Sequence, residues 1–560
     1  MRRVAGLLAP ALVILALPSC ITRDNTLGSN LVPLSHLYDV YTMEFPLTDI
    51  QMKMLDSLSG YSNYRMTIGA VRDPEFGLTK RSCALSLVPV ADSVDFGRNP
   101  VFKSFTFTAA RDTISYADPT EKDILQNINV YELQDPMDFS FVDLNTPVAH
   151  KDERITDGIP VYNGKDSLTF RFNKAFGEKY MNISTADLKD MKEYLKKYPG
   201  IYIDTDEPVG MGGRINMFNL QLGVNLSYGY VTKDYAELKF SAEYNGARKD
   251  SSFLFYFSPN DFVDLNTLVQ AKKESDYPDY YTFPQYCFNS TYHETRGREG
   301  RATDKIRIEG GGGLKAVFSA QEILDRMRED IVKHGDPSEV IITRASLILP
   351  FEFPEDYKDM FRYPDYISPT CRISYKDGVS FANLTDVSSS SEDPGKINRS
   401  LLQYSPDITY HIQKLLTVDD SANISNYDIW TLLMSTEYFE ADNSNSEAMS
   451  EYMYQMQQMM YLNSIYNGYG GYGGYGGYGY GGYGYGYGGY GYGGYGGYGY
   501  SNYYSMALLA SMYNSASSTS NLKSRIDMDK DRYFDAVLNG PEAPDGRVPM
   551  MRVIYALPKE

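Results

Sequence analysis

The chain has few of the residues that build metal and catalytic sites. Its 560 residues include five histidines, four cysteines and one tryptophan. The sequence contains no Cys-x-x-Cys pair and no cluster of cysteine with histidine, so a structural zinc site is not expected. The Gly-x-Ser-x-Gly motif of α/β-hydrolases is absent as well. We therefore expect no metal, no cofactor and no catalytic residue, although a carboxylate pair like that of glycosidases is invisible in a single sequence.

Positive charge and long apolar runs are also scarce. Lys and Arg number 53 against 72 Asp and Glu, which gives a formal net charge of −19. A chain this acidic, without basic clusters, is a poor candidate for binding nucleic acid or anionic lipid. After residue 20, no segment reaches the roughly 18 consecutive apolar residues that indicate a transmembrane helix.

The N-terminus has the pattern of an export signal that ends at a lipidated cysteine. Arg2 and Arg3 precede an apolar run of about 14 residues, which is too short to span a bilayer. The run closes with Leu17-Pro18-Ser19-Cys20, which resembles the lipobox of bacterial lipoproteins, although Pro18 is unusual at its position. We expect residues 1–19 to be removed and Cys20 to carry the acyl chains that hold the mature chain on a membrane. The alternative is an ordinary secreted protein in which Cys20 stands there by chance.

Processing and lipidation would change both the charge and the cysteine count. Removal of Arg2 and Arg3 takes the formal net charge from −19 to −21. Lipidation of Cys20 leaves Cys83, Cys287 and Cys371, which allow at most one disulfide. We expect these three side chains to be buried and mostly unpaired, and whether two of them form a disulfide stays open.

Alternating apolar residues recur along the chain and predict half-buried strands. Turns rich in Asp, Asn, Gly and Pro separate these runs, which is typical of antiparallel sandwiches. The predicted fold class is mainly β, with two antiparallel β-sandwich-like (jelly-roll-like) domains and a few packing helices. The alternating sets are Phe105/Phe107, Ile128/Val130, Leu168/Phe170/Phe172, Leu238/Phe240/Ala242/Tyr244, Ala345/Leu347/Leu349/Phe351/Phe353 and Cys371/Ile373/Tyr375.

Two capping patterns predict packing helices. Ser184 opens the first, whose apolar stripe runs from Leu188 to Tyr198 and stops at Pro199-Gly200. Ser319 opens the second, with Ile323, Met327 and Ile331 on one stripe and Gly335 beyond its end.

The domain organisation follows from shifts in composition. We expect a signal peptide at 1–19, a lipidated tether at 20–45, a first β-rich domain at 46–300 and a second at 301–560. A low-complexity insertion at about 441–520 interrupts the second domain, and its residues 467–500 are almost only glycine and tyrosine. Ordering so much glycine costs entropy that no apolar face offsets, so we expect the insertion to be disordered. Many of the 51 tyrosines lie here, and the role of the tract stays open.

Several segments resemble one known family. They are residues 26–33 (Thr-Leu-Gly-Ser-Asn-Leu-Val-Pro), 68–80 with Asp73-Pro-Glu-Phe-Gly77, 200–204, 308–315 and 342–350. Together they resemble the domain-of-unknown-function 4270 family, outer-membrane lipoproteins of Bacteroidota. The resemblance implies a lipid-anchored protein of the outer membrane but supplies no catalytic residue. The family setting slightly favours the cell surface over the periplasmic face, and the Tyr/Gly tract departs from the family pattern.

Three motifs suggest chemistry and are better explained by structure. Gly310–Gly313 lacks the Gly-Lys-Ser/Thr of a phosphate loop, so we expect a tight turn or a close backbone approach. His293-Glu294 lacks the second histidine of a zinc-protease motif. The acidic run 527–531 lacks the glycine and glutamate of a calcium loop, and 204–207 is a second oxygen-rich cluster after a strand. We interpret both as solvated turns, with incidental Ca²⁺ binding as the alternative.

Three functional hypotheses remain. The first is a non-enzymatic binding or assembly subunit that docks on an outer-membrane protein complex through a protein partner. The second is a surface glycan-binding or adhesion module, for which exposed aromatic side chains would be the sign. The third and weakest is a glycosidase-like hydrolase. The partner, the glycan and the oligomeric state are not deducible from these residues.

Anchoring through Cys20 is directly testable. We expect Cys20→Ala to leave the membrane fraction or to accumulate as uncleaved precursor, because no acyl chain can then be attached. Fractionation of cells followed by mass spectrometry of the N-terminus measures both outcomes. A processed Cys20→Ala variant that still fractionates with the membrane would contradict the lipoprotein prediction.

Overall fold

The computed structural model describes residues 37–559, apart from 441–521 and the shorter stretches 64, 113–114, 118–124, 138–141, 221, 226–229, most of 260–279, 284, 295–296, 376–377, 385–392, 394, 419–422 and 529. The predicted fold class is confirmed, since the structure is mainly β, with several antiparallel sheets in a sandwich-like arrangement. No described helix is long and apolar enough to cross a membrane.

The first β region is a sandwich of two sheets. Its larger sheet has the order β10 (His150–Arg154), β9 (Gln126–Leu133), β13 (Ile201–Thr205), β5 (Gly77–Leu85), β4 (Arg65–Asp73), β14 (Gly212–Asn219), β8 (Tyr116–Ala117), with β20 (Cys287–His293), β3 (Tyr61–Ser62) and β11 (Val161–Tyr162) attached. The facing sheet has the order β12 (Ser167–Arg171), β7 (Arg98–Ala110), β17 (Tyr235–Tyr244), β18 (Ala247–Phe257), β6 (Leu87–Pro89). One hydrophobic core joins the two sheets, and it includes the predicted pairs Phe105/Phe107 and Ile128/Val130.

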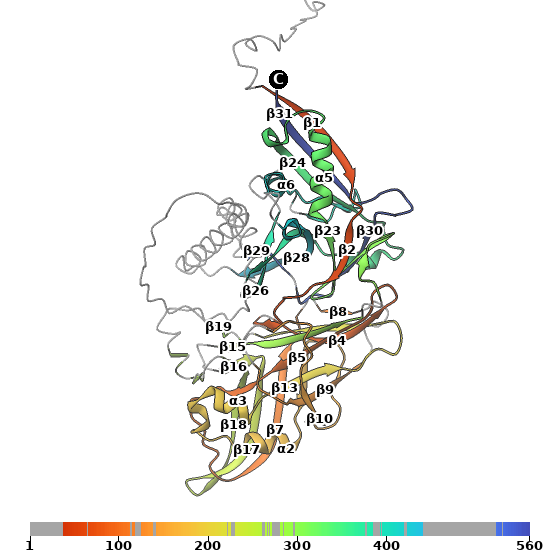
Figure 1. Cartoon of the computed structure of the whole chain (residues 1–560). Helices are drawn as coiled ribbons and strands as arrows, with labels where there is room; N and C mark the ends of the chain where they lie inside the picture. Colours follow the sequence, from red (N-terminus) through yellow and green to blue (C-terminus); the bar gives the residue numbers. More distant parts are fainter. Residues whose placement is uncertain are drawn as a thin grey trace, which may run out of the picture.

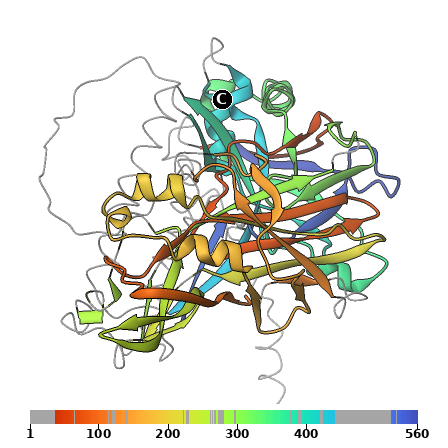
Figure 2. The ribbon, with the colours of Figure 1, turned by 90° about the horizontal axis from the view of Figure 1, so that it is seen from below.

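Smaller elements complete this region. A three-stranded sheet has the order β16 (Tyr230–Lys233), β15 (Leu222–Asn225), β19 (Tyr280–Phe283). Helices α2 (Lys174–Tyr180) and α3 (Met191–Lys197) contribute Phe176, Tyr180 and Tyr194 to the same core. Seen from below, both helices lie across the near end of the sandwich (Figure 2).

The second β region contains the start and the end of the described chain. A four-stranded sheet has the order β1 (Tyr38–Pro46), β31 (Met550–Pro558), β24 (Ile341–Pro350), β27 (Gln403–Tyr404). A seven-stranded sheet has the order β21 (Gly300–Arg301), β2 (Ile50–Met54), β23 (Leu314–Phe318), β28 (Ile429–Glu440), β25 (Tyr366–Tyr375), β26 (Gly378–Asn383), with β29 (Leu522–Met528) paired to β28. A further pair joins β22 (Lys305–Glu309) to β30 (Asp535–Asn539), and α5 (Ala320–Ile331) and α6 (Thr409–Leu416) pack on the shared core.

The regions differ from the predicted boundaries at the N-terminus. Nine residue pairs, from Tyr38↔Pro558 to Pro46↔Met550, join β1 to β31. Strand β2 pairs with β23. Residues 38–54 therefore belong to the second core, and the last residues assigned to the tether (20–45) are strand. Figure 1 shows β1 and β31 side by side at one end of an elongated body, with β7, β17 and β18 at the other.

The predicted alternation of buried residues in β24 is correct along the strand and fails after its end. Ala345, Leu347, Leu349 and Phe351 are buried as predicted. Phe353, the last member of the set, is 54% exposed. It lies beyond the end of β24 at Pro350, where no neighbouring strand keeps the alternation.

One of the two predicted helices is correct and the other is divided. Ser319 caps α5 by accepting from the N–H of Glu322, as predicted. The helix predicted from Leu188 to Tyr198 is wrong as a single element. Asp190 is extended, and its carboxylate accepts from the N–H groups of Lys192 and Glu193, so that a new helix begins there after one short turn.

The low-complexity insertion, including the predicted disordered tract 467–500, lies outside the described residues. The strands on either side of it pair with each other, from Met434↔Met528 to Glu440↔Leu522. The insertion therefore leaves and re-enters the sheet at adjacent positions.

This closure makes the tract removable. We expect replacement of residues 467–500 by a short Gly/Ser linker to leave the melting temperature unchanged or slightly higher, because closing a loop costs only about 0.6 kcal/mol per doubling of its length. Calorimetry of both mature proteins measures the effect. A fall of more than about 5 °C would mean that the tract is structural.

Candidate functional site: a buried charge cluster

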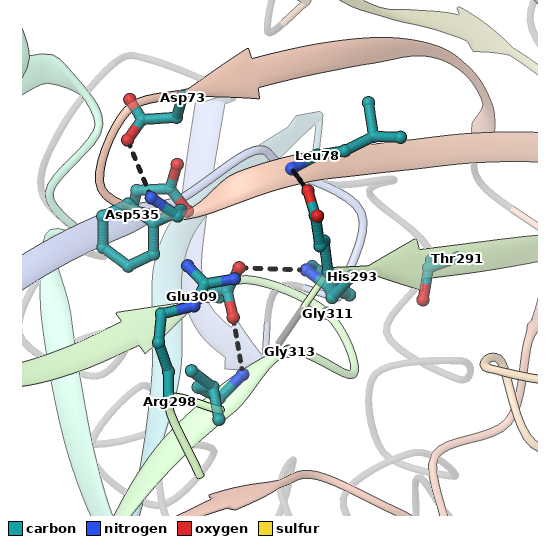
Figure 3. A network of polar contacts seen from close by, with 12 residues as sticks. Asp73, Leu78, Thr291, His293, Arg298, Glu309, Gly311, Gly313 and Asp535 are labelled. Atoms are coloured by element: carbon teal, nitrogen blue, oxygen red, sulfur yellow. Dashed lines mark hydrogen bonds and ion pairs between the residues drawn. The ribbon is translucent and has the colours of Figure 1, made fainter. Parts of the chain in front are cut away.

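Charged side chains from six strands meet between the two cores. We call them the junction cluster: Asp73 (β4), Arg81 (β5) and His293 (β20) from the first region, with Glu309 (β22), Lys315 (β23), Asp535 (β30) and Arg362 from the second. All are buried except Arg362, which is nearly so. Figure 3 shows His293 and Glu309 close to the turn that contains Gly311 and Gly313, with Asp73 and Asp535 farther from it. The cluster thus lies where the two regions meet.

The central hydrogen bond of the cluster joins His293 to Glu309. His293 Nδ1 lies 3.3 Å from Glu309 Oε1, and Glu309 Oε2 accepts from the N–H of Leu314 at 3.1 Å. Burial lowers the pKa of His293, although Glu309 acts in the opposite direction. Burial raises the pKa of Glu309, but His293 and the Leu314 N–H outweigh it, and the net pKa is lowered. We therefore assign a neutral imidazole whose Nδ1–H donates to an ionised carboxylate.

The four glycines at 310–313 form the turn that connects β22 to β23, next to His293 and Glu309. Lys315 turns back on the loop and donates to the carbonyl oxygens of Glu309, Gly311 (3.1 Å) and Gly313 (3.0 Å). Its ammonium is fully used by the loop's own backbone, which differs from a phosphate loop. Burial lowers the pKa of Lys315 to about 7, with Glu309 acting in the opposite direction.

The same turn confirms the predicted close approach. A Cβ on Gly311, whose φ is +57°, would lie 2.6 Å from Nη1 of Arg81. A Cβ on Gly313 would lie 2.5 Å from Cβ of Glu309 and 2.9 Å from the ring of His293. Both glycines are therefore required by contact with the junction cluster rather than by a ligand.

Arg362 links the two regions through two carboxyl groups. Its Nη1 lies 2.5 Å from Asp73 Oδ2 and 3.8 Å from Asp535 Oδ2. Asp535 is directly opposite Glu309 in the β22–β30 pair. Burial, and then the charge of Glu309, raise the pKa of Asp535 well above its usual value. The charge of Glu309 on the facing strand thus favours the protonated form of Asp535.

Two carboxyl groups with pKa values moved apart could in principle act as acid and base. Glu309 is 0% exposed and Asp535 is 3% exposed, however, so a substrate would have to displace core side chains to reach either. The junction cluster instead fixes strands of one region against strands of the other. Removing one partner of a buried pair leaves an uncompensated charge, at a cost of about 3–5 kcal/mol.

The rejected motifs fall close to this junction or on the adjoining sheet. Glu294 accepts from the N–H of Leu78 at 3.0 Å and lies 3.8 Å from Arg72. Lys530 donates to the carbonyl oxygens of Ser59 and Tyr61, and Asp531 is buried. Within the part of the chain that the structure describes, no group of three His, Cys, Asp or Glu residues could hold a metal ion.

The acidic run 204–207 forms local contacts on the first region. Asp206 accepts from Asn127 at 2.7 Å and from Asn129 at 2.9 Å. Glu207 pairs with Arg72 and Lys80. Burial raises the pKa of Asp204, so this residue is not the solvated carboxylate that the sequence predicts.

The predicted burial of Cys83, Cys287 and Cys371 is confirmed, and none is disulfide-bonded. Burial raises the pKa of the Cys287 thiol well above its usual value, and Cys83 is the next cause. The lipobox residues Leu17, Pro18, Ser19 and Cys20 lie outside the described residues.

Sequence reasoning found the glycine turn and His293 but not the charges around them. Arg81 interrupts β5, and Lys315 interrupts β23, in strands whose other residues are largely buried. A charge inside a strand that is otherwise buried predicts a partner in the core. That signal was present, but it does not identify the partner.

Comparisons with protein-family models, with curated proteins and with solved structures find no match to this chain.

The glycine turn gives a matched mutational test. We expect Gly313→Ala to lower the free energy of unfolding by about 1–3 kcal/mol, because the new methyl group overlaps Glu309 and His293. Gly210→Ala is the control, since nothing lies within 4 Å of its Cβ. Urea unfolding should place that control within about 0.5 kcal/mol of wild type. Equal effects at both positions would contradict the close packing of Gly313 against Glu309 and His293.

Lys315 predicts the sign of a pH dependence. Its folded pKa is about 7 against an ordinary value of 10.5, so the unfolded chain binds more protons between these values. The contribution of Lys315 to stability should therefore rise with pH, by at most about 1.4 kcal/mol per unit. We expect the free energy of unfolding of wild type, relative to Lys315→Met, to increase from about pH 7 to about pH 9.5. A difference that stays flat across this range would refute the assignment.

Proposed function

We propose that this chain is a non-enzymatic outer-membrane lipoprotein that acts as a binding or assembly subunit of an envelope protein complex. The export pattern ending at Cys20 and the resemblance to the domain-of-unknown-function 4270 family of Bacteroidota support this setting. In this proposal the acyl chains on Cys20 hold the protein on the outer membrane, with the cell surface favoured over the periplasmic face.

The observation that carries the proposal is the position of the two chain ends. The N–H of Lys559 donates to the carbonyl oxygen of Leu37 at 2.8 Å, directly beyond the β1–β31 pair. Both ends of the described chain therefore lie at one pole of an elongated body (Figure 1). Sixteen residues, 21–36, lie between Cys20 and Leu37, so the distance from one to the other is at most about 60 Å. A lipid on Cys20 would keep this pole near the membrane and leave the opposite pole free to extend away from it.

The junction cluster supports a role other than catalysis. Its acid–base groups lie in the core and hold two β regions together, which suits a rigid scaffold. A catalytic site instead needs its groups within hydrogen-bond reach of a bound substrate. The carboxyl pair of Glu309 and Asp535 has no such access, which weighs against a glycosidase-like activity at this site.

A second candidate, a glycan-binding or adhesion module, is favoured by one surface feature. Phe353, Tyr357 and Phe361 are all exposed within a short segment after β24. Aromatic rings in solvent are unusual and often mark binding surfaces. Sugars stack on such rings, so this segment is where a glycan would bind.

Purification from membranes separates the two candidates. We expect the lipidated protein, extracted in mild detergent, to co-purify in fixed stoichiometry with a membrane protein, and Tyr357→Ala/Phe361→Ala to leave that complex intact. Native mass spectrometry measures the stoichiometry. Purification as a lone species that binds a glycan array, with binding lost in the double variant, would favour the adhesion module instead.

A further inference from the structure

Strand β1 has a long backbone edge that no other described strand covers. It is the outermost strand of its sheet, and among the described residues it pairs with β31 alone. All nine of its residues are in register, with no bulge. In Figure 1 it lies along the margin of the upper part of the body. A regular edge of this length presents a row of unpaired N–H and C=O groups to any strand that approaches it.

Two other edges in the molecule carry exposed charge. The first half of β18 carries exposed Arg248, Lys249 and Asp250. Strand β10 is exposed and charged from Lys151 to Arg154. Such charges hinder the addition of another strand.

Strand β1 lacks this protection. Residues 40–43 carry no charge. Its two acidic residues are already paired within the sheet, Asp39 with Lys559 at 3.2 Å and Glu44 with Arg552 at 2.5 Å. The middle of the β1 edge therefore lacks the charges that β18 and β10 carry, as does the shorter edge strand β26 (Gly378–Asn383).

The outward face beside the first half of this edge is apolar, whereas Glu44 and Arg552 lie on the same face in its second half. Val40 and Ile341 both pair with Ala556, so the three side chains form one row across the sheet. Val40 is 65% exposed, Ile341 is 45% exposed and Tyr38, on the same face of β1, is 46% exposed. The opposite face is buried against α5. A strand added to β1 would place its outward side chains next to Val40 and Tyr38, which favours apolar residues at alternate positions.

We propose that the free edge of β1 accepts an extended strand of a membrane-embedded protein partner, with apolar residues at the alternate positions that face Tyr38 and Val40. This inference rests on the proposed function and identifies the surface through which the subunit assembles. The choice of a membrane-embedded partner follows from the chain itself. The segment that leads to Cys20 enters at Leu37, one residue before β1, so a lipid on Cys20 would keep this edge within about 60 Å of the bilayer. Strand addition combines main-chain hydrogen bonds with side-chain pockets at every second residue.

The test is a register-resolved cross-link in the full-length lipidated protein, in the membranes of the cells that produce it. A photo-reactive amino acid replaces Tyr38, Val40 or Thr42 in turn, all on the outward face, and Val101 on β7 as the control. We expect one membrane protein to be cross-linked from β1 and not from Val101. The modified residue in that partner should move by two positions each time the probe moves by two, as strand pairing requires. Cross-links to residues 21–36 or to a second copy of the chain would overturn the proposal. Cross-links whose position in the partner does not shift by two residues with the probe would overturn it as well.

Matched charge variants complete the test. With the probe at Thr42, Val40→Lys should reduce the adduct by roughly tenfold or more, whereas Val101→Lys, at a valine of 50% exposure, should stay within about twofold of wild type. Equal melting temperatures of the two variants establish that both fold. If Val40→Lys does not fold, Thr42→Lys with the probe at Val40 takes its place. Membrane fractionation of the same samples tests the anchor separately. Anchored protein without adducts at β1 refutes the strand-addition surface alone, while unanchored protein refutes the proposed function.

Discussion

The structure depends on how a small set of buried charges is neutralised between two hydrophobic cores. Each charge taken out of water costs several kcal/mol, so it is tolerated only where a partner is held in place. Here the partners come from opposite regions: His293 meets Glu309, and Arg362 meets Asp73. These two contacts cross from one region to the other and fix strands of one against strands of the other. Lys315 is instead satisfied by its own loop, and Arg362 also lies near Asp359 and Asp535 of its own region.

The glycine turn follows from the same constraint. The buried ammonium of Lys315 needs three acceptors, and the carbonyl oxygens of a tight loop supply them. Arg81 and His293 then approach the loop so closely that a side chain on Gly311 or Gly313 would overlap them. A motif that looks like a ligand loop in the sequence thus serves to pack backbone against buried charge.

Local signals in the sequence predicted strands and helix starts, whereas contacts between residues far apart in the chain were not predicted. Period-two patterns identified strands such as β7 and β24, and Ser319 identified the start of α5, because these signals are local. The broken helix at Asp190 was missed because a second N-cap within an apolar stripe competes with the first. Pairs such as Asp73 with Arg362, 289 residues apart, depend on tertiary folding that no local pattern encodes. For the same reason the pairing of β1 with β31 was missed, and residues 38–45 were assigned to a tether.

The junction cluster and the β1 edge are connected through the rigidity of the body between them. The core that lies beneath β1 and β31 also contains Ile306, Ile308 and Leu314, whose strands carry Glu309 and Lys315 at or next to their ends. A strand bound at β1 would therefore be coupled through packed side chains to the charges that orient the first region. Fixing the edge at the membrane would fix the direction in which the far sandwich points. A flexible junction would lose that orientation. This gives a physical reason for joining the two regions through buried polar contacts, although solvated contacts would cost less free energy to form.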